Sequence, residues 1–164
     1  MAESKHWQIA EALRTTLAAI EGDAGTTYWY APDAVVICDV WDDVADPSVG
    51  AEVMAIRPGE ESHSEETPNT LRATAEFFVL LLRKTTATDP SPYQSDGGLR
   101  LKEKDRVIRD FLRALWEDVT LGGLVDNVNA DSLYVNRDMG VDGDQWVAAE
   151  ARFTVTYTYP KETP

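Results

Sequence analysis

The stretch from Val147 to Tyr159 reads VAAEARFTVTYTY and decides the expected fold. Its odd-numbered positions are all hydrophobic, whereas most of the positions between them are threonine, arginine or glutamate. Because successive side chains of a strand point to opposite faces, this alternation predicts a long strand with one buried and one wetter face. Pro160 is expected to end the strand, since proline has no N–H to donate to a ladder. A neighbouring strand is predicted over 130–137.

Three segments nearer the N-terminus are predicted to be strands as well. Residues 34–38 (AVVIC) form an unbroken hydrophobic run, which predicts a strand buried on both faces that continues to Val40 and Trp41. A shorter strand is expected over 51–57. Strict alternation and clustered aromatic residues favour a strand over 70–82. A helical face is also present in that segment, through Leu71, Ala75, Phe78 and Leu82.

Two helices are expected to cover the sheet. Residues 5–21 place hydrophobic side chains at helical spacing, with Ser4 as the N-cap and Gly22 as the stop. Residues 101–118 place a broad hydrophobic stripe among lysines and arginines, and LGG at 121–123 closes the helix. The predicted class is therefore α+β, with a largely antiparallel or mixed β-sheet packed against two main α-helices.

A single domain over 1–164 is expected, because 164 residues suffice for one core and are few for two. Two segments lack hydrophobic periodicity. Residues 58–69 (PGEESHSEETPN) are predicted to form a polar loop, and residues 84–99 a long connecting loop. Residues 160–164 are predicted to be a short disordered C-terminal tail.

The charge balance is strongly acidic. Fifteen Lys and Arg stand against 29 Asp and Glu, which gives a net charge of −14 and a pI near 4.4. Such a surface repels phosphates and argues against gripping nucleic acid. The longest hydrophobic run, 77–82, is too short to span a membrane, and the charged N-terminus is unlike a signal peptide. We expect synthesis in a cytoplasm, with the single Cys38 as a small buried side chain.

The sequence offers little chemistry. His6 and His63 have no second His or Cys at ligand spacing and are expected to be solvated surface residues. Carboxylates cluster at 39–46 and at 138–144, and the latter lacks the closing Glu of an EF-hand loop, so a solvated turn is favoured. Phosphate-binding GxxxxGK[ST], dinucleotide-binding GxGxxG and hydrolase GxSxG motifs are absent. We therefore predict no catalytic, cofactor-binding or metal-binding residue and no enzymatic activity.

The layout of the chain matches a known pattern. An N-terminal helix ends near Gly22, a strand follows Pro32, a second helix runs into DVTLGGLV at 118–125, and FTVTYTYP at 153–160 forms a closing strand. This layout, over about residues 5–160, resembles the tail terminator (tail completion) proteins of long-tailed phages, such as the lambda-type terminator and related neck proteins.

The resemblance implies a small structural subunit that forms a ring, commonly a hexamer. The ring would cap the finished tail tube, stop its polymerisation and present a face to the head connector. The implied partners are copies of the chain, the tail-tube protein and a head–tail connector or stopper protein, with no cofactor and no membrane. DNA would pass through without specific binding, since an acidic wall repels phosphate. The implied location is the tail or neck of the virion, assembled in the host cytoplasm.

Candidate contact residues follow from this hypothesis, although each is equally compatible with a solvated loop. The subunit-interface candidates are Glu60, Glu61, Glu65, Tyr93 and Gln94, and the candidates for the wall of the lumen are Asp42 and Asp43.

Three other interpretations stay open. The chain could be a neighbouring virion component, either a head–tail stopper or a tail-tube subunit. It could be a monomeric acidic binding module that mimics DNA, although its carboxylates fall mostly in predicted turns. It could also be a hydrolase that uses the cluster at 39–46, for which no partner nucleophile is evident.

Overall fold

The computed structural model describes residues 4–23, 27–39, 51–85, 95–137 and 146–161. The five strands form one sheet in the order β1-β2-β3-β5-β4, in which β1 and β2 are parallel and the other neighbours antiparallel. The predicted α+β class, with a mixed sheet and two helices, is confirmed. In chain order the elements are α1 (Lys5–Ala18), β1 (Ala34–Ile37), β2 (Glu52–Thr67), β3 (Thr70–Lys84), α2 (Ser95–Glu117), β4 (Asn127–Asn136) and β5 (Trp146–Pro160).

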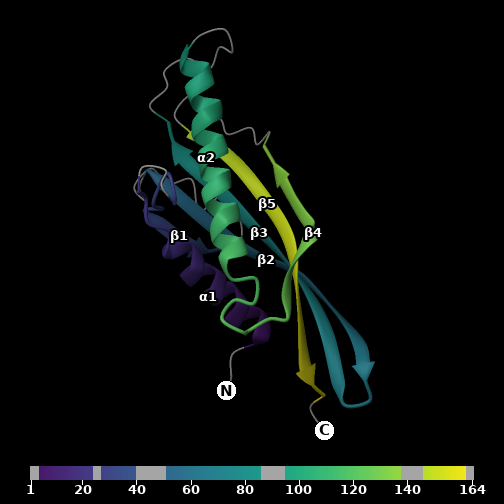
Figure 1. Ribbon diagram of the computed structural model, residues 1–164. Coiled ribbons are helices and arrows are strands. Elements are labelled where there is room, and N and C mark those ends of the chain that lie inside the picture. Colours follow the sequence, from purple (N-terminus) through teal and green to yellow (C-terminus); the bar gives the residue numbers. More distant parts are fainter. Residues whose placement is uncertain (1–3, 24–26, 40–50, 86–94, 138–145, 162–164) are drawn as a thin grey trace.

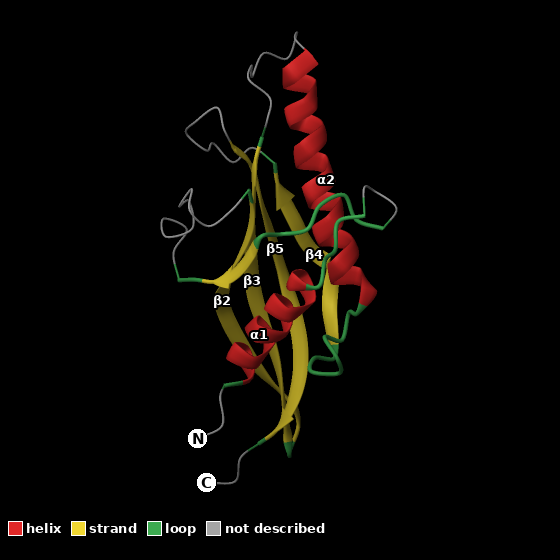
Figure 2. Ribbon diagram, turned by 90° about the vertical axis from the view of Figure 1, so that its left-hand side faces the viewer, coloured by secondary structure: helices red, strands yellow, loops and turns green. Residues whose placement is uncertain are grey.

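Both helices pack on the same face of the sheet, where they enclose the main core (Figure 2). Phe77 of β3 and Phe153 of β5 stack there with their ring centroids 6.2 Å apart, and Phe111 of α2 lies 6.3 Å from Phe153. All three rings are fully buried, and each such burial contributes roughly 1.5–3 kcal/mol. The hydrophobic alternation of β3 and β5 therefore builds the surface on which the helices pack.

The turn between α2 and β4 explains the local signature at 118–125. Leu121, Gly122 and Gly123 have φ values of 49°, 71° and 81°, a conformation that glycine adopts without steric cost. The Asp118 carboxylate accepts hydrogen bonds from the Thr120 hydroxyl at 2.6 Å and from the Gly122 N–H at 2.5 Å, and these bonds lower its pKa. The signature thus has a conformational cause, the sharp exit from a helix.

Three strands continue past the helices as a projecting arm (Figure 1). We define the arm as Glu61–Thr67 of β2, Thr70–Ala75 of β3 and Val155–Pro160 of β5. β2 and β3 pair from Glu52↔Arg83 to Thr67↔Thr70, so they form one long hairpin. β5 pairs along the whole of β3, up to Thr70↔Pro160.

The arm corrects one prediction. Residues 58–69 were expected to be a polar loop, but β2 extends through them to Thr67 and only the tip is a turn. The pattern misled because this part of β2 is exposed to solvent, so it lacks the hydrophobic alternation of a half-buried strand. The strand expected at 51–57 is correspondingly much longer.

Other boundaries differ from expectation by smaller amounts. α1 ends at Ala18, and α2 begins at Ser95, so the end of the predicted 84–99 loop is helical. β1 is only half-buried, because it is the edge strand of the sheet. Cys38, which follows β1, is half-buried and not fully buried as predicted.

The boundaries of two further predicted segments also differ from the structure. Pro160, predicted to open a disordered tail, is the last residue of β5. The strand predicted at 130–137 begins earlier, at Asn127. No helix within the described ranges is long and apolar enough to cross a membrane.

Candidate functional site

The base of the arm contains a cluster of polar side chains centred on Glu61. The Tyr157 hydroxyl donates to Glu61 Oε2 at 2.7 Å. His63 Nε2 lies 2.8 Å from Glu61 Oε1, and His6 Nδ1 lies 3.6 Å from Glu61 Oε2. One carboxylate therefore joins side chains from α1, β2 and β5.

The second nitrogen of His63 extends this cluster toward the tip. Its Nδ1 lies 2.7 Å from the Tyr159 hydroxyl, and the two rings meet edge to face. An ionised carboxylate only accepts hydrogen bonds, so we infer that His63 Nε2 carries the proton that faces Glu61. In the neutral imidazole Nδ1 then accepts from Tyr159.

His6 is held by the core as well as by Glu61. It lies in the first turn of α1, and its ring meets Phe77 edge to face at 5.0 Å. Its Nε2 is buried without a hydrogen-bond partner. The prediction of a solvated surface residue is confirmed for His63, which is 43% exposed, and is wrong for His6, which is half-buried against Phe77. The β2–β3 hairpin brings His63 back beside α1, so both histidines contact Glu61.

Tyr157 is a permanent donor in this cluster. Its side chain is 2% exposed, and burial, followed by the hydrogen bond to Glu61, raises its pKa. The neutral phenol is thus favoured, because an ionised one would be desolvated beside a carboxylate. The arrangement suits a fixed structural bond between strands.

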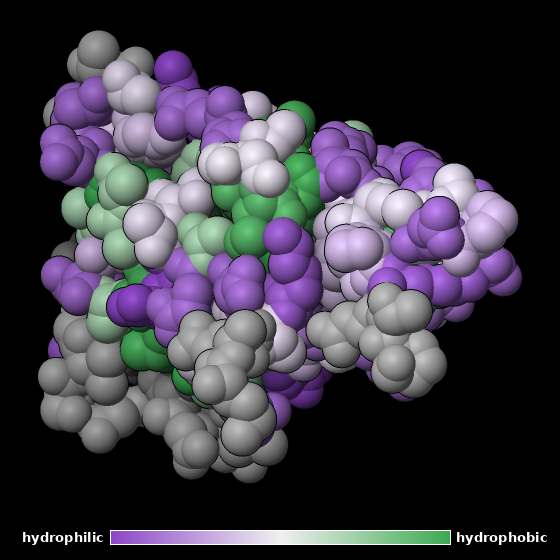
Figure 3. All heavy atoms as spheres, turned by 90° about the horizontal axis from the view of Figure 1, so that it is seen from below, coloured by the Kyte–Doolittle hydropathy of each residue, from purple (hydrophilic) through white to green (hydrophobic). Residues whose placement is uncertain are grey.

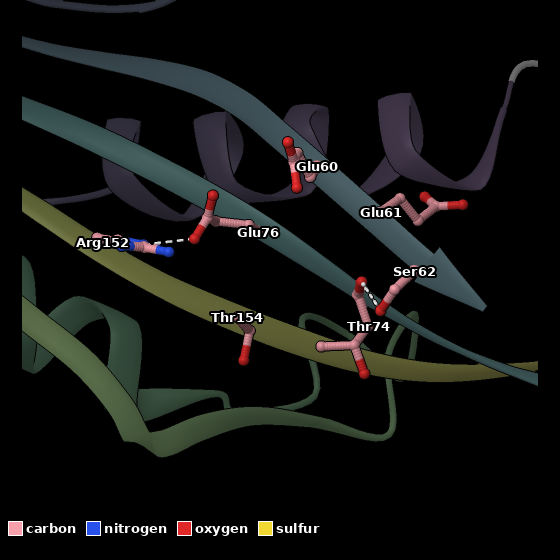
Figure 4. A pocket seen from close by; sticks show the side chains of 7 residues that line it. All are labelled: Glu60, Glu61, Ser62, Thr74, Glu76, Arg152 and Thr154. Atoms are coloured by element: carbon pink, nitrogen blue, oxygen red, sulfur yellow. Dashed lines mark hydrogen bonds and ion pairs between the residues drawn. The ribbon is translucent and has the colours of Figure 1, made fainter. Parts of the chain in front are cut away.

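The face of the sheet that points away from the helices has a surface cavity of about 200 Å³ beside Glu61 (Figure 4). It lies beside a register shift between Pro58 and Glu61, which marks a β-bulge in β2. An ion pair between Arg152 and Glu76 forms part of its wall. The complete lining is Glu60, Glu61, Ser62, Thr74, Glu76, Arg152 and Thr154.

Gly59 permits the close packing at this bulge. A Cβ on Gly59 would lie 2.9 Å from Phe78 Cε2 and 3.1 Å from the Glu76 carbonyl oxygen. Phe78 is itself fixed by two guanidinium groups, with Arg57 at 4.5 Å and Arg152 at 5.8 Å from its ring centroid. Any larger residue than glycine would displace this packing.

The outer edge of the arm is open along β2. β1 pairs only with Val53–Ile56, so from Arg57 to Thr67 no strand of the described structure lies beside the outer edge of β2. Near the tip, Glu65 pairs with Lys161 at 2.6 Å. Seen from the end with the arm at the right, the arm surface is mainly hydrophilic (Figure 3).

A second buried polar group lies at the other end of β2. The Glu52 side chain is 1% exposed and pairs with Arg83 at 2.9 Å. Arg83 in turn stacks on the Tyr30 ring, 3.4 Å from its centroid. Burial raises the pKa of Glu52 to about 7, against the opposing effect of Arg83. This group joins the start of β2 to the segment before β1.

Asp110 of α2 fixes the same segment. Its carboxylate accepts hydrogen bonds from the backbone N–H groups of Trp29 and Tyr30 at 2.8–2.9 Å. Burial raises the pKa of Asp110, while these two N–H groups lower it. A buried carboxylate with two backbone donors is explained by its role in holding the loop, without reference to a ligand.

The predicted contact residues divide into two groups. Glu60, Glu61 and Glu65 lie on β2 at the base and side of the arm, and Glu61 is the centre of the polar cluster. The other candidates, Tyr93 and Gln94 for the interface and Asp42 and Asp43 for the lumen, lie outside the described residues. Across the described segments, no group of three or more His, Cys, Asp or Glu is arranged to hold a metal ion.

Comparison with family models finds no match, and neither does comparison with curated proteins. Function must therefore be inferred from the residues and the fold of this chain. The feature that stands out is the arm, with its internal cross-strand bonds and its open edge.

Proposed function

We propose that the protein is a structural subunit that assembles with copies of itself into a closed ring. Following the resemblance of its sequence, we propose further that the ring is the tail terminator of a long-tailed phage. In that role it caps the tail tube, ends tube polymerisation and joins the tail to the head connector.

The arm carries this proposal. It projects beyond both helices, and β2 lacks a neighbouring strand along its outer edge from Arg57 to Thr67 within the described residues. An open edge of this length is a liability for a monomer, because its unpaired N–H and C=O groups template pairing with other chains. Such an edge is accounted for when a partner subunit covers it.

Exposed large side chains support a role in assembly. Tyr134 and Leu101 are each 65% exposed and Trp7 is 41% exposed, on β4, α2 and α1 respectively. Tyr134 and Trp7 are aromatic, and tyrosine and tryptophan are favoured anchors of subunit interfaces. They lie on separate elements, as expected if one patch of a subunit meets a different patch of the next.

The net charge of −14 is compatible with DNA passage through such a ring. Phosphates meet like charge on an acidic wall, so DNA moves along it without adhering. Ring assembly and DNA passage are separate parts of the proposal, and the first is tested directly.

Electron microscopy of the purified protein, alone and mixed with purified tail tubes, tests the proposal. A terminator forms a single ring layer and adds one layer to the tube end. Long cylinders would instead identify a tail-tube subunit, and binding to portal assemblies without binding to tubes would identify a stopper. Absence of rings under both conditions would contradict the proposal.

A further inference from the structure

We propose that the outward side of α2 docks on a second copy, at the cavity that Glu60 and Glu76 line on the sheet face away from the helices. This inference rests on the proposed ring and names one pair of surfaces that meet between neighbouring subunits.

A row of basic side chains follows the outward side of α2. These residues recur every three or four positions, so they lie in one line along the helix. Phe111 and Leu115, on the other side of α2, are buried against the sheet, so the row points away from it. We define the basic row as Lys102, Arg106, Arg109 and Arg113. In a chain with a net charge of −14, this row is a local exception.

Arg109 carries more positive charge than its neighbours neutralise. Its side chain is 72% exposed, and its Nε lies 3.0 Å from Asp105 Oδ2. The other oxygen of Asp105 lies 3.2 Å from Arg137 Nη1, so two guanidinium groups share one carboxylate. A guanidinium has five N–H donors, and an outside carboxylate can therefore bind to Arg109 as well.

Two other members of the row are held in place by the segment before β1. The guanidinium carbon of Arg106 lies 3.9 Å from the centroid of the Trp29 ring. Arg113 donates to the Thr27 carbonyl at 3.0 Å. Side chains that are already fixed lose less freedom on binding, so the row is partly preorganised for a partner.

The cavity at the base of the arm offers the opposite charge. Glu60 is exposed and forms no ion pair with another residue of the described segments. Glu76 lies beside it in the wall of the cavity, paired with Arg152 (Figure 4). A cavity of about 200 Å³ has room for the guanidinium end of an arginine. The site therefore suits a basic side chain such as Arg109 of a second copy.

An exposed aromatic ring lies next to the cavity. Tyr134 of β4 pairs with Arg152 of β5 in the register of the sheet, and it is 65% exposed. Because paired residues share a face, its ring lies on the same side of the sheet as the cavity. A guanidinium binds favourably over an aromatic ring, so Tyr134 adds a second contact for the basic row.

The basic row and the cavity lie at the same level on opposite sides of the subunit. Phe111 of α2 packs near Phe153 of β5, with the ring centroids 6.3 Å apart. Arg109 precedes Phe111 by two residues and therefore points away from the sheet. Arg152 and Thr154 flank Phe153 and line the cavity on the other face. The helix side of one copy can thus meet the sheet face of the next without a shift along the strands.

This contact between front and back suits a closed ring. Rotation about an axis parallel to the strands keeps every residue at its level, so it can bring the basic row of one copy to the cavity of the next. Each copy then presents its row to one neighbour and its cavity to the other, which is the heterologous contact that a ring requires.

Charge reversal tests the contact. Arg109→Glu and Glu60→Lys each place like charges together, so each should raise the dissociation constant for self-association by about tenfold or more. The double variant Arg109→Glu/Glu60→Lys restores opposite charges and should recover association. Both side chains are exposed, so the fold should tolerate the changes. Analytical ultracentrifugation measures association, and circular dichroism checks that each variant is folded.

A matched control separates a local contact from a general effect of charge. Arg109→Glu/Glu21→Lys has the same net charge as the rescuing double variant, but Glu21 is an exposed residue outside the cavity. It should associate as weakly as Arg109→Glu. An equimolar mixture of the Arg109→Glu and Glu60→Lys proteins should assemble, because alternating copies meet with opposite charges at every contact.

The remaining outcomes separate this inference from the proposed ring. Rings that form normally from Arg109→Glu, or a double variant that associates no better than the control, would overturn the inference and leave the ring intact. If Arg109→Glu assembled normally but lost retention of a DNA duplex in a gel shift, the basic row would be a DNA contact instead. If the unchanged chain is monomeric alone, ring addition to tail-tube ends in electron microscopy becomes the readout for the same variants. No ring under either condition would overturn both proposals.

Discussion

The Tyr157 hydroxyl donates a hydrogen bond of 2.7 Å to Glu61 Oε2, and this bond joins β5 to β2 across the intervening strand β3. The bond lies where the arm leaves the helix-covered body. It holds the two outer strands of the arm in register at its base, so it bears on how rigidly the arm is presented to a partner.

Tyr157→Phe should destabilise the fold by about 1–2 kcal/mol, because it removes a buried donor and leaves Glu61 short of a partner. Tyr159→Phe is the matched control, since it keeps the bond to Glu61 and lies at a more exposed position. Urea unfolding of both variants measures the difference. Equal midpoints for the two variants and the unchanged protein would show that the bond contributes nothing.

Glu52→Gln should reveal the raised pKa of Glu52, about 7 against 4.5 for an ordinary glutamate. The neutral form is favoured in the folded state, so the contribution of Glu52 to stability is greatest below pH 4.5 and declines as pH rises toward 7. Over that window the free energy of unfolding of the unchanged protein should fall by up to about 3 kcal/mol relative to the variant. If the difference in the free energy of unfolding between the two proteins did not change with pH, the raised pKa of Glu52 would be refuted.

Gly59→Ala should destabilise the fold by roughly 1–3 kcal/mol, because its Cβ would press on Phe78 and on the Glu76 carbonyl. Adding Phe78→Leu should recover part of the loss, since it removes the nearer contact. Thermal unfolding measures both variants. A Gly59→Ala protein as stable as the original would mean that the bulge tolerates a side chain.

Glu65→Pro should weaken assembly while leaving the monomer folded. The Ile56 carbonyl accepts from the Cys38 N–H and so faces the outer edge, and the register of β2 with β3 past the bulge turns the Glu65 N–H to the same edge. Proline at position 65 therefore removes a donor from the open edge of β2 without removing a bond to β3. Glu65→Ala is the matched control, because both changes remove the ion pair with Lys161 and only proline alters the edge. Analytical ultracentrifugation should show at least a tenfold rise in the dissociation constant for Glu65→Pro alone. Equal association of the two variants would argue against this edge.

The sequence predicted the strands and helices whose side chains face the core, and it missed the outer part of β2, which is exposed to solvent. β3 and β5 bury one face under the helices, so their alternation is explicit at positions such as Phe77 and Phe153. Beyond Arg57, β2 has no hydrophobic alternation, and its glycine and proline resembled a loop. Pairing with β3 overrides that local preference.

The polar cluster was missed for a related reason. His6 and His63 are far apart in the sequence and have no shared spacing, so only the long hairpin brings both to Glu61. Glu61 is one of the predicted contact residues, but its bond to Tyr157 depends on the register of β2, β3 and β5, which the sequence does not reveal. Residues 58–67 have no hydrophobic alternation, so nothing in their sequence indicates the strand that brings these side chains together.

Native mass spectrometry of the purified protein over a range of concentrations tests most directly whether copies of the chain join into a ring. The account predicts one dominant species whose mass is a whole multiple of 18.2 kDa and which does not grow further as concentration rises. A single species of 18.2 kDa at every concentration, together with tail tubes whose ends gain no ring in electron microscopy, would contradict it, and so would an unlimited series of larger multiples.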